Sequence, residues 1–431
     1  MPTAAIDVGS SSVKAALLEG TEILPGSMVS AAYETSRDHG KAEVNPDELA
    51  VAIRRVAGQL NWSDVTGVGL TGMGPAWLAM DDRGRPVSPI VTHQDQTHWL
   101  AGVTIEEAIG KEEHLALAGN RPASGGISST VAKDLLPTFS NVHKVGHWPT
   151  WIAFLLTGRW AMDPSNAGFS GLMDVRTGRW SPVLCETAGV EMGFLPEIVD
   201  AAEVLGETRK NDLGIPPDLP VFGGFIDGSG PILLAGATAG QIVHSAGSTD
   251  VLAMCLDRPM PREGLLCRPL GTGRKWVSAA TSSGGGDAIE WLHQLAFSEL
   301  PFGEFVQQLP AFHQRKQSSF MHPLPGGNRQ AVLKELGQWR GLTLGTTRND
   351  LASAVVTASV SGHAVRAGSL LDLAEKVGID DFPDVVTTGG GTVLASLMHK
   401  AWVEAGLGSD WVFRDEPHAT LRGIGAIARE R

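Results

Sequence analysis

Short apolar runs bounded by glycine or proline alternate along this chain with stretches in which apolar residues recur every three or four positions. Runs of the first kind predict buried strands, and four of them are expected at residues 65–70, 219–225, 240–245 and 383–389. Stretches of the second kind predict helices with one apolar face. The alternation of strands and helices indicates an α/β fold.

Helix boundaries are also visible in the sequence. A helix is predicted to start at Asn45 as N-cap, with Pro46 as its first residue and Glu48 as a reciprocal cap. A buried helix is expected to end at Gly158, because glycine commonly terminates helices. Residues 350–378 predict one long helix.

One tight hairpin is predicted near the N-terminus, where apolar runs at residues 4–6 and 13–18 flank a polar tip that begins with Asp7. Glycine and serine in such a tip expose N–H groups and hydroxyls that hold a phosphate. Asp7 would repel a phosphate but suits a divalent cation. An ordinary hairpin with a polar tip is the alternative for this turn alone. The residues expected to hold phosphate are Gly9, Ser10, Ser11, Ser12 and Lys14.

A second segment, residues 245–254, repeats this order of strand, small polar turn and strand. One such turn in each of two lobes predicts a division near residue 235, with domains at residues 1–235 and 236–431. The residues of the second turn are Gly247, Ser248 and Thr249.

A carboxylate and two glycine-rich loops extend this picture. Asp227 follows a predicted strand at the possible start of a helix, where it would stay ionised and accept a hydrogen bond from a substrate hydroxyl. A simple helix cap is the alternative. The loops in residues 281–291 and 385–397 let a flat or charged ligand approach the backbone, although tight turns explain them too. Their central glycines are Gly285, Gly389, Gly390 and Gly391.

Composition narrows the class of protein. The 47 acidic residues exceed the 34 basic ones without a basic cluster, so no nucleic-acid partner is expected. The cysteines, Cys185, Cys255 and Cys267, lack the spacing of metal ligands, and neither a leader peptide nor a membrane span is visible. Reduced thiols, a cytoplasmic location and no membrane partner are therefore expected.

Motifs of other enzyme classes are absent from the sequence. It contains no P-loop, no dinucleotide fingerprint after the first strand, no H-E-x-x-H and no paired C-x-x-C. His93, Asp95 and His98 lie close together and suggest a metal site, but polar groups that bind the hydroxyls of a small substrate fit the segment better.

Taken in order, these segments resemble the FGGY family of carbohydrate kinases, within the actin–hexokinase-like ATPase superfamily, along nearly the whole chain. Residues 7–12 match the family's D-x-G-[TS]-[ST]-S hairpin, and Asp95 keeps the aspartate of its W-x-D motif. Residues 151–190 resemble its Thr-Gly helix end and its Asp-x-Ser-Asn-Ala segment, which here contains Asn166.

The glycine motifs complete the resemblance. "GGFIDG" matches the family's G-x-x-D, whose aspartate is the catalytic base, and this identifies Asp227. "SAGSTDVL" matches its second phosphate loop and "TTGGGTVLASL" its nucleotide loop.

The resemblance implies two ribonuclease-H-like domains of the actin-like ATPase type, with a sugar and MgATP in the cleft between them. It implies a phosphotransferase that uses ATP and Mg²⁺ on a hydroxyl of a ketose or polyol, xylulose-like as a first candidate. Asp227 would act as the base, Asp7 would help to hold Mg²⁺, and both turns would hold the β- and γ-phosphates. Residues 389–391 would lie against the adenosine. The residues on the sugar side would be Met73, Gly74, Asp95, Asn166 and Asp227.

Departures from the family pattern keep two alternatives open. Met73-Gly74-Pro75 stands where xylulose-kinase-like members carry Gln-Met-His, and His93 replaces the family's tryptophan. A non-catalytic sugar-binding regulator and a nucleotide switch related to actin or heat-shock ATPases are the alternatives. The glycine- and serine-rich loop 119–130 is expected at the surface, with a place in the lining of the sugar site as the alternative, and a homodimer is left open.

Overall fold

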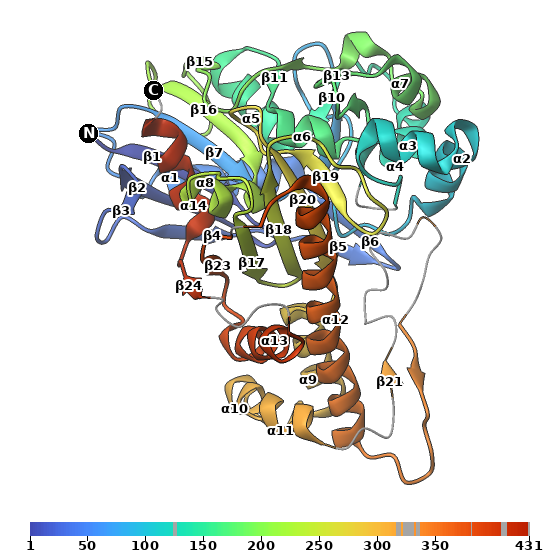
Figure 1. The fold of residues 1–431 in the computed structure, drawn as a ribbon. Helices are drawn as coiled ribbons and strands as arrows, with labels where there is room; N and C mark the ends of the chain where they lie inside the picture. Colours follow the sequence, from blue (N-terminus) through green and yellow to red (C-terminus); the bar gives the residue numbers. More distant parts are fainter. Residues whose placement is uncertain are drawn as a thin grey trace. The chain divides into compact units, whose positions relative to one another are not determined.

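The computed structural model describes residues 1–123, 127–315, 320–321, 332, 337–380, 382–406 and 412–429 (Figure 1). Residues 124–126 of the loop 119–130 therefore lie outside the described residues. The described residues of this loop are buried except for half-buried Arg121, so the expected surface position is wrong for them. The chain forms two compact units. The first unit holds Met1–Thr238, Cys255–Val277 and His418–Arg431, and the second unit holds Ala239–Met254 and Ser278–Pro417. The chain first passes from one unit to the other close to the expected residue 235. It then returns to the first unit twice, whereas the predicted domains were two continuous segments.

The first unit is built on a mixed sheet with the strand order β15-β16-β7-β1-β2-β3, in which β4 also pairs with β2. β1 and β2 form the predicted N-terminal hairpin, and β7 and β16 continue the sheet parallel to β1. The strands of this sheet are β1 Thr3–Val8, β2 Ser12–Glu19, β3 Glu22–Ile23, β4 Val29–Ala32, β7 Val68–Gly72, β15 Gly206–Glu207 and β16 Pro220–Ile226.

A second mixed sheet has the order β19-β20-β18-β17-β23-β24. Its hairpin β17–β18 is followed by the parallel neighbours β23 and β24, so it repeats the arrangement of the first sheet. This repetition confirms the relationship between the two turns that the sequence suggested. The strands are β17 Ile242–Ala246, β18 Asp250–Leu256, β19 Leu266–Pro269, β20 Trp276–Ser282, β23 Val385–Thr388 and β24 Phe413–Asp415.

Smaller sheets complete the strand inventory of the described residues. One sheet has the order β10-β8-β9-β6-β5, and three two-stranded pairs are β11-β14, β12-β13 and β21-β22. These strands are β5 Ser36–Asp38, β6 Lys41–Val44, β8 Ala76–Met80, β9 Ile90–Thr92, β10 Lys144–His147, β11 Ala161–Met162, β12 Met173–Asp174, β13 Arg179–Trp180, β14 Glu197–Ile198, β21 Phe320–Met321 and β22 Trp339–Arg340.

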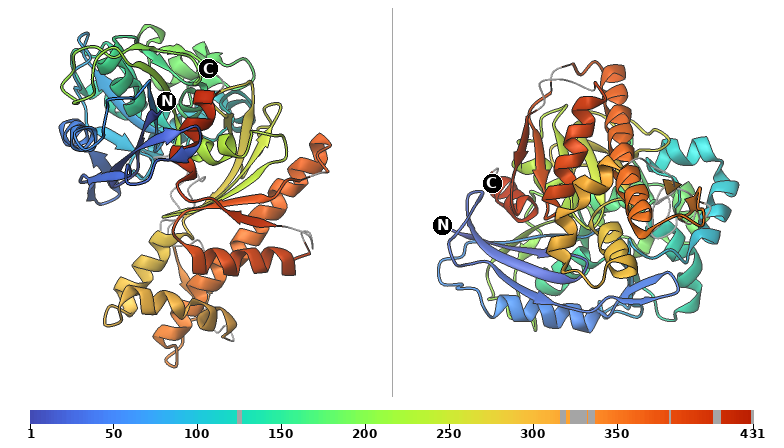
Figure 2. Two further views of the ribbon diagram at one scale, coloured as in Figure 1. Left: turned by 90° about the vertical axis from the view of Figure 1, so that its left-hand side faces the viewer. Right: turned by 90° about the horizontal axis from the view of Figure 1, so that it is seen from below.

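Helices cover these sheets. Those of the first unit are α1 Pro46–Ala57, α2 Trp99–Ile109, α3 Lys111–Ala118, α4 Ser128–Leu135, α5 Trp148–Thr157, α6 Pro164–Phe169, α7 Pro182–Ala188, α8 Gly230–Leu234 and α14 Ala419–Arg429, with the 3₁₀ turns η1 Leu136–Thr138, η2 Met192–Phe194 and η3 Asp227–Ser229. Those of the second unit are α9 Gly286–Ala296, α10 Phe302–Gln307, α11 Leu309–Gln314, α12 Arg348–Val377 and α13 Thr392–Glu404. The long helix α12 runs beside α13, as the orange and red helices of Figures 1 and 2 show.

The predicted helix ends are largely confirmed. The side chain of Asn45 caps α1 by accepting a hydrogen bond from the backbone N–H of Asp47, while the expected reciprocal cap from Glu48 is not formed. Gly158 ends α5 in the left-handed conformation, which glycine adopts without strain. A Thr347 capping box starts α12.

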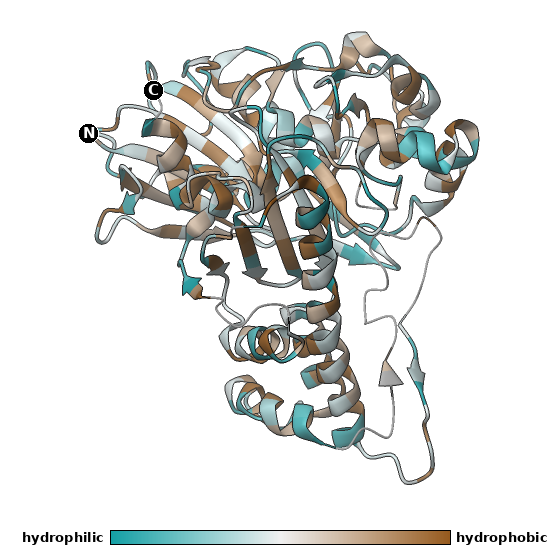
Figure 3. Cartoon of the chain, viewed as in Figure 1, coloured by the Kyte–Doolittle hydropathy of each residue, from teal (hydrophilic) through white to brown (hydrophobic). Residues whose placement is uncertain are grey.

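Apolar residues of the strands and helices form the cores. β17 and β18 are mostly brown, hydrophobic, in Figure 3, in agreement with their buried side chains. The C-terminal helix α14 packs on α8, where a Cβ on Gly423 would lie 2.5 Å from the Cα of Gly230. This close backbone contact needs glycine and explains why the last residues belong to the first unit.

Two expectations from composition can be compared with the structure. Cys185, Cys255 and Cys267 are free and buried, so no disulfide joins them. Within the described part of the chain, no helix is long and apolar enough to cross a membrane.

Thermal stability is expected to fall as the pH is lowered from 7 to 5, because neutral histidines are buried in the first unit. Burial lowers the pKa of His114 and of His147 to about 4. Unfolded histidine takes up a proton near pH 6.5, so this stability is complete above pH 6.5 and is lost as the pH falls toward 4. The cost at pH 5 is about 2 kcal/mol for each group.

Thermal unfolding of the wild type and of His114→Leu at both pH values checks this expectation. The leucine variant should lose less stability between pH 7 and 5 than the wild type does. Equal losses would show that His114 does not contribute.

Candidate active site

Three parallel strands of the first unit bring predicted site residues to one edge of the sheet. β1, β7 and β16 are neighbours in register, with Val8 opposite Gly72 and Gly72 opposite Ile226. Because the carboxyl ends of neighbouring parallel strands meet at one edge, Asp7, Met73 and Asp227 lie close together there. Ligand sites in α/β proteins commonly form at this edge.

The two carboxylates of this edge influence one another. Burial and then the nearby carboxylate of Asp227 raise the pKa of Asp7 to about 7, whereas Lys14, its partner across the hairpin, acts to lower it. The Oδ1 atom of Asp7 is buried without a hydrogen-bond partner. Asp227 is half-buried, and its Oδ1 accepts a hydrogen bond of 2.7 Å from the N–H of Gly228. A pair of close carboxylates with an unsatisfied oxygen favours a bound cation.

The first predicted phosphate turn is fixed by hydrogen bonds from two residues that were not predicted from the sequence, Tyr33 and Thr35. The hydroxyl of Tyr33 donates to the carbonyl of Gly9, and the Thr35 hydroxyl donates to the carbonyl of Ser10 at 2.8 Å. The N–H of Gly9 closes the hairpin on the carbonyl of Ser12 at 2.9 Å. The carbonyl groups of Gly9, Ser10 and Ser12 are therefore engaged within the protein, and contact of the turn's N–H groups and hydroxyls with phosphate stays a prediction.

Replacing Tyr33 by phenylalanine is expected to raise the KM for ATP roughly 2–10-fold, because loss of one hydrogen bond loosens this turn. Steady-state kinetics with varied ATP measure the effect. Thr66→Val, which removes a hydroxyl bonded to Pro2 elsewhere in the unit, is the matched control. An unchanged KM in Tyr33→Phe would leave the tyrosine with a packing role alone.

Three of the predicted sugar-side residues, Met73, Asp95 and Asn166, are buried and hydrogen-bonded within the protein, whereas Gly74 and Asp227 are half-buried. Asp95 accepts hydrogen bonds from the backbone N–H groups of Ala42 and Thr97, both at 2.8 Å. Met73 is buried and its carbonyl accepts from the Trp148 indole, and a Cβ on Gly74 would lie 3.5 Å from Oδ1 of Asn166. Their contact with a sugar stays a prediction.

Asn166 belongs to a buried chain of polar groups. Its Nδ2 donates to Asp163 at 2.7 Å and to the carbonyl of Gly224 at 2.5 Å, and its Oδ1 accepts from Nδ1 of His147 at 2.7 Å. Nε2 of His147 then accepts from the hydroxyl of Ser128 at 2.6 Å. Through Gly224, this chain is bonded to β16 three residues before Asp227.

In the second unit, three predicted glycine motifs converge. The N–H groups of Gly286 and Asp287 donate to the carbonyls of Gly247 and Ser248, and the N–H of Gly391 donates to the carbonyl of Ala246. A Cβ on Gly285 would lie 2.4 Å from the carbonyl carbon of Thr249. The loops at 247–249, 285 and 389–391 therefore lie directly against one another, and their contact with a nucleotide stays a prediction.

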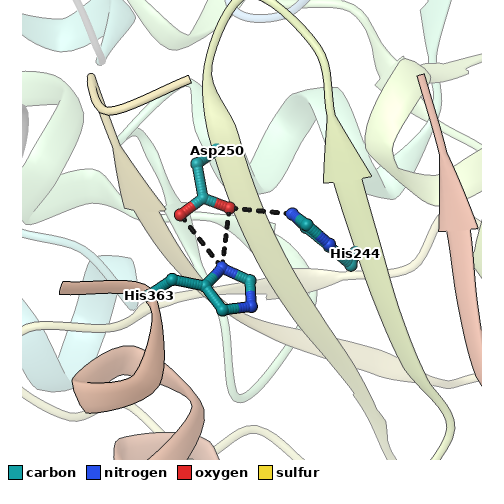
Figure 4. Close-up of side chains that lie close together, drawn as sticks. All are labelled: His244, Asp250 and His363. Carbon is teal, nitrogen blue, oxygen red and sulfur yellow. Dashed lines mark hydrogen bonds and ion pairs between the residues drawn. The ribbon is translucent and has the colours of Figure 1, made fainter. Parts of the chain in front are cut away.

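A buried cluster, here called the Asp250 cluster, supports the second phosphate turn (Figure 4). Asp250 follows Thr249 directly, and its carboxylate bonds Nε2 of His244 at 3.0 Å and Nδ1 of His363 at 3.1 Å. The guanidinium of Arg366 donates to the other carboxylate oxygen, and His244 bonds His399 through its Nδ1 at 2.8 Å.

The geometry of this cluster allows a metal, but its charges favour hydrogen bonds. Burial acts to raise the pKa of Asp250, yet its pKa lies well below the ordinary value because the two histidines and the arginine stabilise the carboxylate. The Arg366 charge already balances Asp250, and a divalent cation would add uncompensated positive charge to a dry interior. The cluster therefore anchors the phosphate turn to α12 and α13. His93, Asp95 and His98 do not form a comparable group among the described residues.

Residues 3–232 match the model of the FGGY family of carbohydrate kinases, N-terminal domain. The match covers more than half of the chain. The protein belongs to this family. Its family membership, its α/β fold of the actin-like ATPase type and its class as a carbohydrate kinase are thus confirmed, and membership implies ATP as phosphate donor.

Relatives cover most of this kinase at low identity. The xylulose kinase of Staphylococcus xylosus is 22% identical over 90% of this chain and 82% of its own length. The structure of gluconate kinase from Lactobacillus acidophilus gives a TM-score of 0.82 at 17% identity and covers 100% of this chain and 89% of that one. The xylulose kinase of Rhodospirillum rubrum gives 0.80 at 21%, with 100% and 90% covered. The structural likenesses show the fold alone.

Proposed function

We propose that this FGGY kinase transfers the γ-phosphoryl group of ATP to a hydroxyl of a small ketose or polyol, with a xylulose-like ketose as first candidate. The observation that carries the proposal is the pair of carboxylates, Asp7 in β1 and Asp227 after β16, which two strands that both pair with β7 bring close enough to influence one another. Relatives named xylulose kinase support the ketose, and the one named gluconate kinase makes sugar acids the nearest alternative.

Asp227 is assigned the role of base. It accepts the proton of the acceptor hydroxyl as that oxygen bonds to the γ-phosphorus and the bond to the leaving ADP oxygen breaks. The turns 9–12 and 247–249 donate hydrogen bonds to phosphate, and Gly389–Gly391 lie against the nucleoside. Such a reaction depends mostly on positioning and charge neutralisation, which small residues and one oriented carboxylate provide.

Asp7 is assigned to Mg²⁺. Its buried Oδ1 lacks a partner, and burial together with the neighbouring carboxylate of Asp227 raises its pKa to about 7. A cation would give this oxygen a partner and would balance the two negative charges. The bound ion would neutralise charge on the transferred phosphate. Replacement of Asp7 by asparagine should therefore raise the Mg²⁺ concentration needed for half-maximal rate.

A panel of pentuloses, hexuloses, heptuloses, alditols and aldonates, incubated with the protein and MgATP, tests the proposal. ADP should be released only with the correct acceptor, and mass spectrometry should find a phosphorylated sugar. ADP release that is independent of every sugar would support the nucleotide switch instead. Calorimetry that finds sugar binding without ATP binding would support the non-catalytic regulator.

A further inference from the structure

Arg268 is a buried cation of the first unit that none of these roles uses. It lies in β19, and its Nη1 donates to the hydroxyl of Ser229 at 2.7 Å and to the carbonyl of Pro269 at 2.9 Å. Ser229 is the last residue of η3, the turn that begins with Asp227. The guanidinium therefore ties the far end of the turn that carries the candidate base to a neighbouring strand.

Packing around the guanidinium limits its movement. A Cβ on Gly228 would lie 3.5 Å from Nη2 of Arg268, so the group runs beside the middle of the same turn. On another side, the guanidinium carbon lies 5.4 Å from the centre of the Phe169 ring. The close approach of α6 to β19 depends on Gly168, whose Cβ would lie 2.7 Å from Pro269. A planar donor held on several sides is a rigid support.

The charge of Arg268 is balanced by carboxylates of the same unit. Burial lowers its pKa to about 10, while Asp163 and Asp227 act to raise it. The side chain therefore stays protonated near neutral pH. Asp163 is already held by Ser165 and Asn166, so its orientation does not depend on the arginine.

We propose that Arg268 is a positioning residue for phosphoryl transfer, because through Ser229 it fixes the turn Asp227–Ser229 in the orientation that the base needs. The proposal rests on the proposed function of Asp227. A displacement of about 1 Å in a reacting group lowers rates by roughly 100-fold while substrates still bind. Loss of the arginine should therefore lower kcat and leave KM nearly unchanged.

Kinetics of Arg268→Met, Arg268→Lys, Ser229→Ala and the double variant Arg268→Met/Ser229→Ala test this role. Arg268→Met should lower kcat by about 10–100-fold, and Ser229→Ala by about tenfold, with both KM values within about twofold of wild type. The double variant should be no slower than Arg268→Met, since both changes remove one contact. Lysine keeps the charge and should restore part of kcat. Arg159→Met, which breaks ion pairs to Glu197 and Glu203, is the matched control and should keep kcat.

Three outcomes overturn the proposal: a wild-type kcat in folded Arg268→Met, multiplicative losses in the double variant, or losses confined to KM. If Arg268→Met does not fold, a wild-type kcat in Ser229→Ala overturns it equally. Asp227→Asn separates the two levels of the argument. If Asp227→Asn is active, the proposed role of Asp227 as the base is wrong. If Asp227→Asn is inactive but Ser229→Ala is fully active, only the proposed role of Arg268 is wrong.

Discussion

Replacement of Asp227 by asparagine is expected to lower kcat by roughly 10²–10⁴-fold, the range that a general base contributes. The amide has the size of the carboxylate and can still accept the 2.7 Å hydrogen bond from the N–H of Gly228, so the turn should keep its shape. It cannot take up the proton of the acceptor hydroxyl. The loss should therefore appear in kcat, while the affinities for sugar and ATP change little.

The measurement needs turnover, binding and stability together. Steady-state rates give kcat, calorimetry gives the affinity for ATP, and thermal unfolding shows that the variant is folded. Asp64→Asn removes an exposed carboxylate of the same unit and should retain the wild-type rate. Turnover of Asp227→Asn within about twofold of wild type would refute the assignment of the base.

The sequence predicted those parts of the site that depend on local patterns. Both hairpins, the strand before Asp227 and the glycine loops are coded by adjacent residues, since apolar runs make the strands and small residues make the turns. Parallel pairing then brings their ends together, as it does for Asp7 and Asp227 and, separately, for Gly247 and Gly389. The order of motifs along the chain was therefore sufficient for the fold and the family.

The residues that hold the turns of the candidate site in place could not be predicted from local sequence patterns. Tyr33, Arg268 and Arg366 act through single long-range hydrogen bonds to Gly9, Ser229 and Asp250, and no local spacing distinguishes them from ordinary polar residues. The sequence also does not show whether a polar side chain already forms hydrogen bonds within the protein. Asp95, predicted to bind the sugar, already accepts hydrogen bonds from the backbone of Ala42 and from the backbone and hydroxyl of Thr97.

The domain division near residue 235 was predicted from the repeat of the two turns, which is a local pattern. Membership of residues 255–277 and 418–431 in the first unit depends on packing, so the sequence did not predict it. The Gly423–Gly230 contact of α14 with α8 joins positions almost two hundred residues apart in the chain, and only the folded backbone reveals it.

Replacement of Gly389 by alanine is expected to weaken ATP binding by roughly 10–100-fold, because the loop has no room for a side chain. The added Cβ would lie 2.3 Å from the carbonyl oxygen of Ala246, and the residue has a φ of +107°, which costs an L-residue about 1–3 kcal/mol. Relief of this clash moves the loop away from the second phosphate turn. Sugar affinity should stay unchanged, because the sugar-side candidates belong to the first unit.

Gly303→Ala is the matched control, since Gly303 lies in α10 of the second unit and a Cβ at that position meets nothing within 4 Å. It makes the same chemical change outside the predicted nucleotide loops and should alter ATP affinity by no more than about twofold. Calorimetry with ATP and with the sugar acceptor on both variants gives the comparison. Equal losses in the two variants would mean that the clash at Gly389 does not control binding. A loss of sugar affinity alone would place this loop on the acceptor side, and the nucleotide assignment of the second unit would then be wrong.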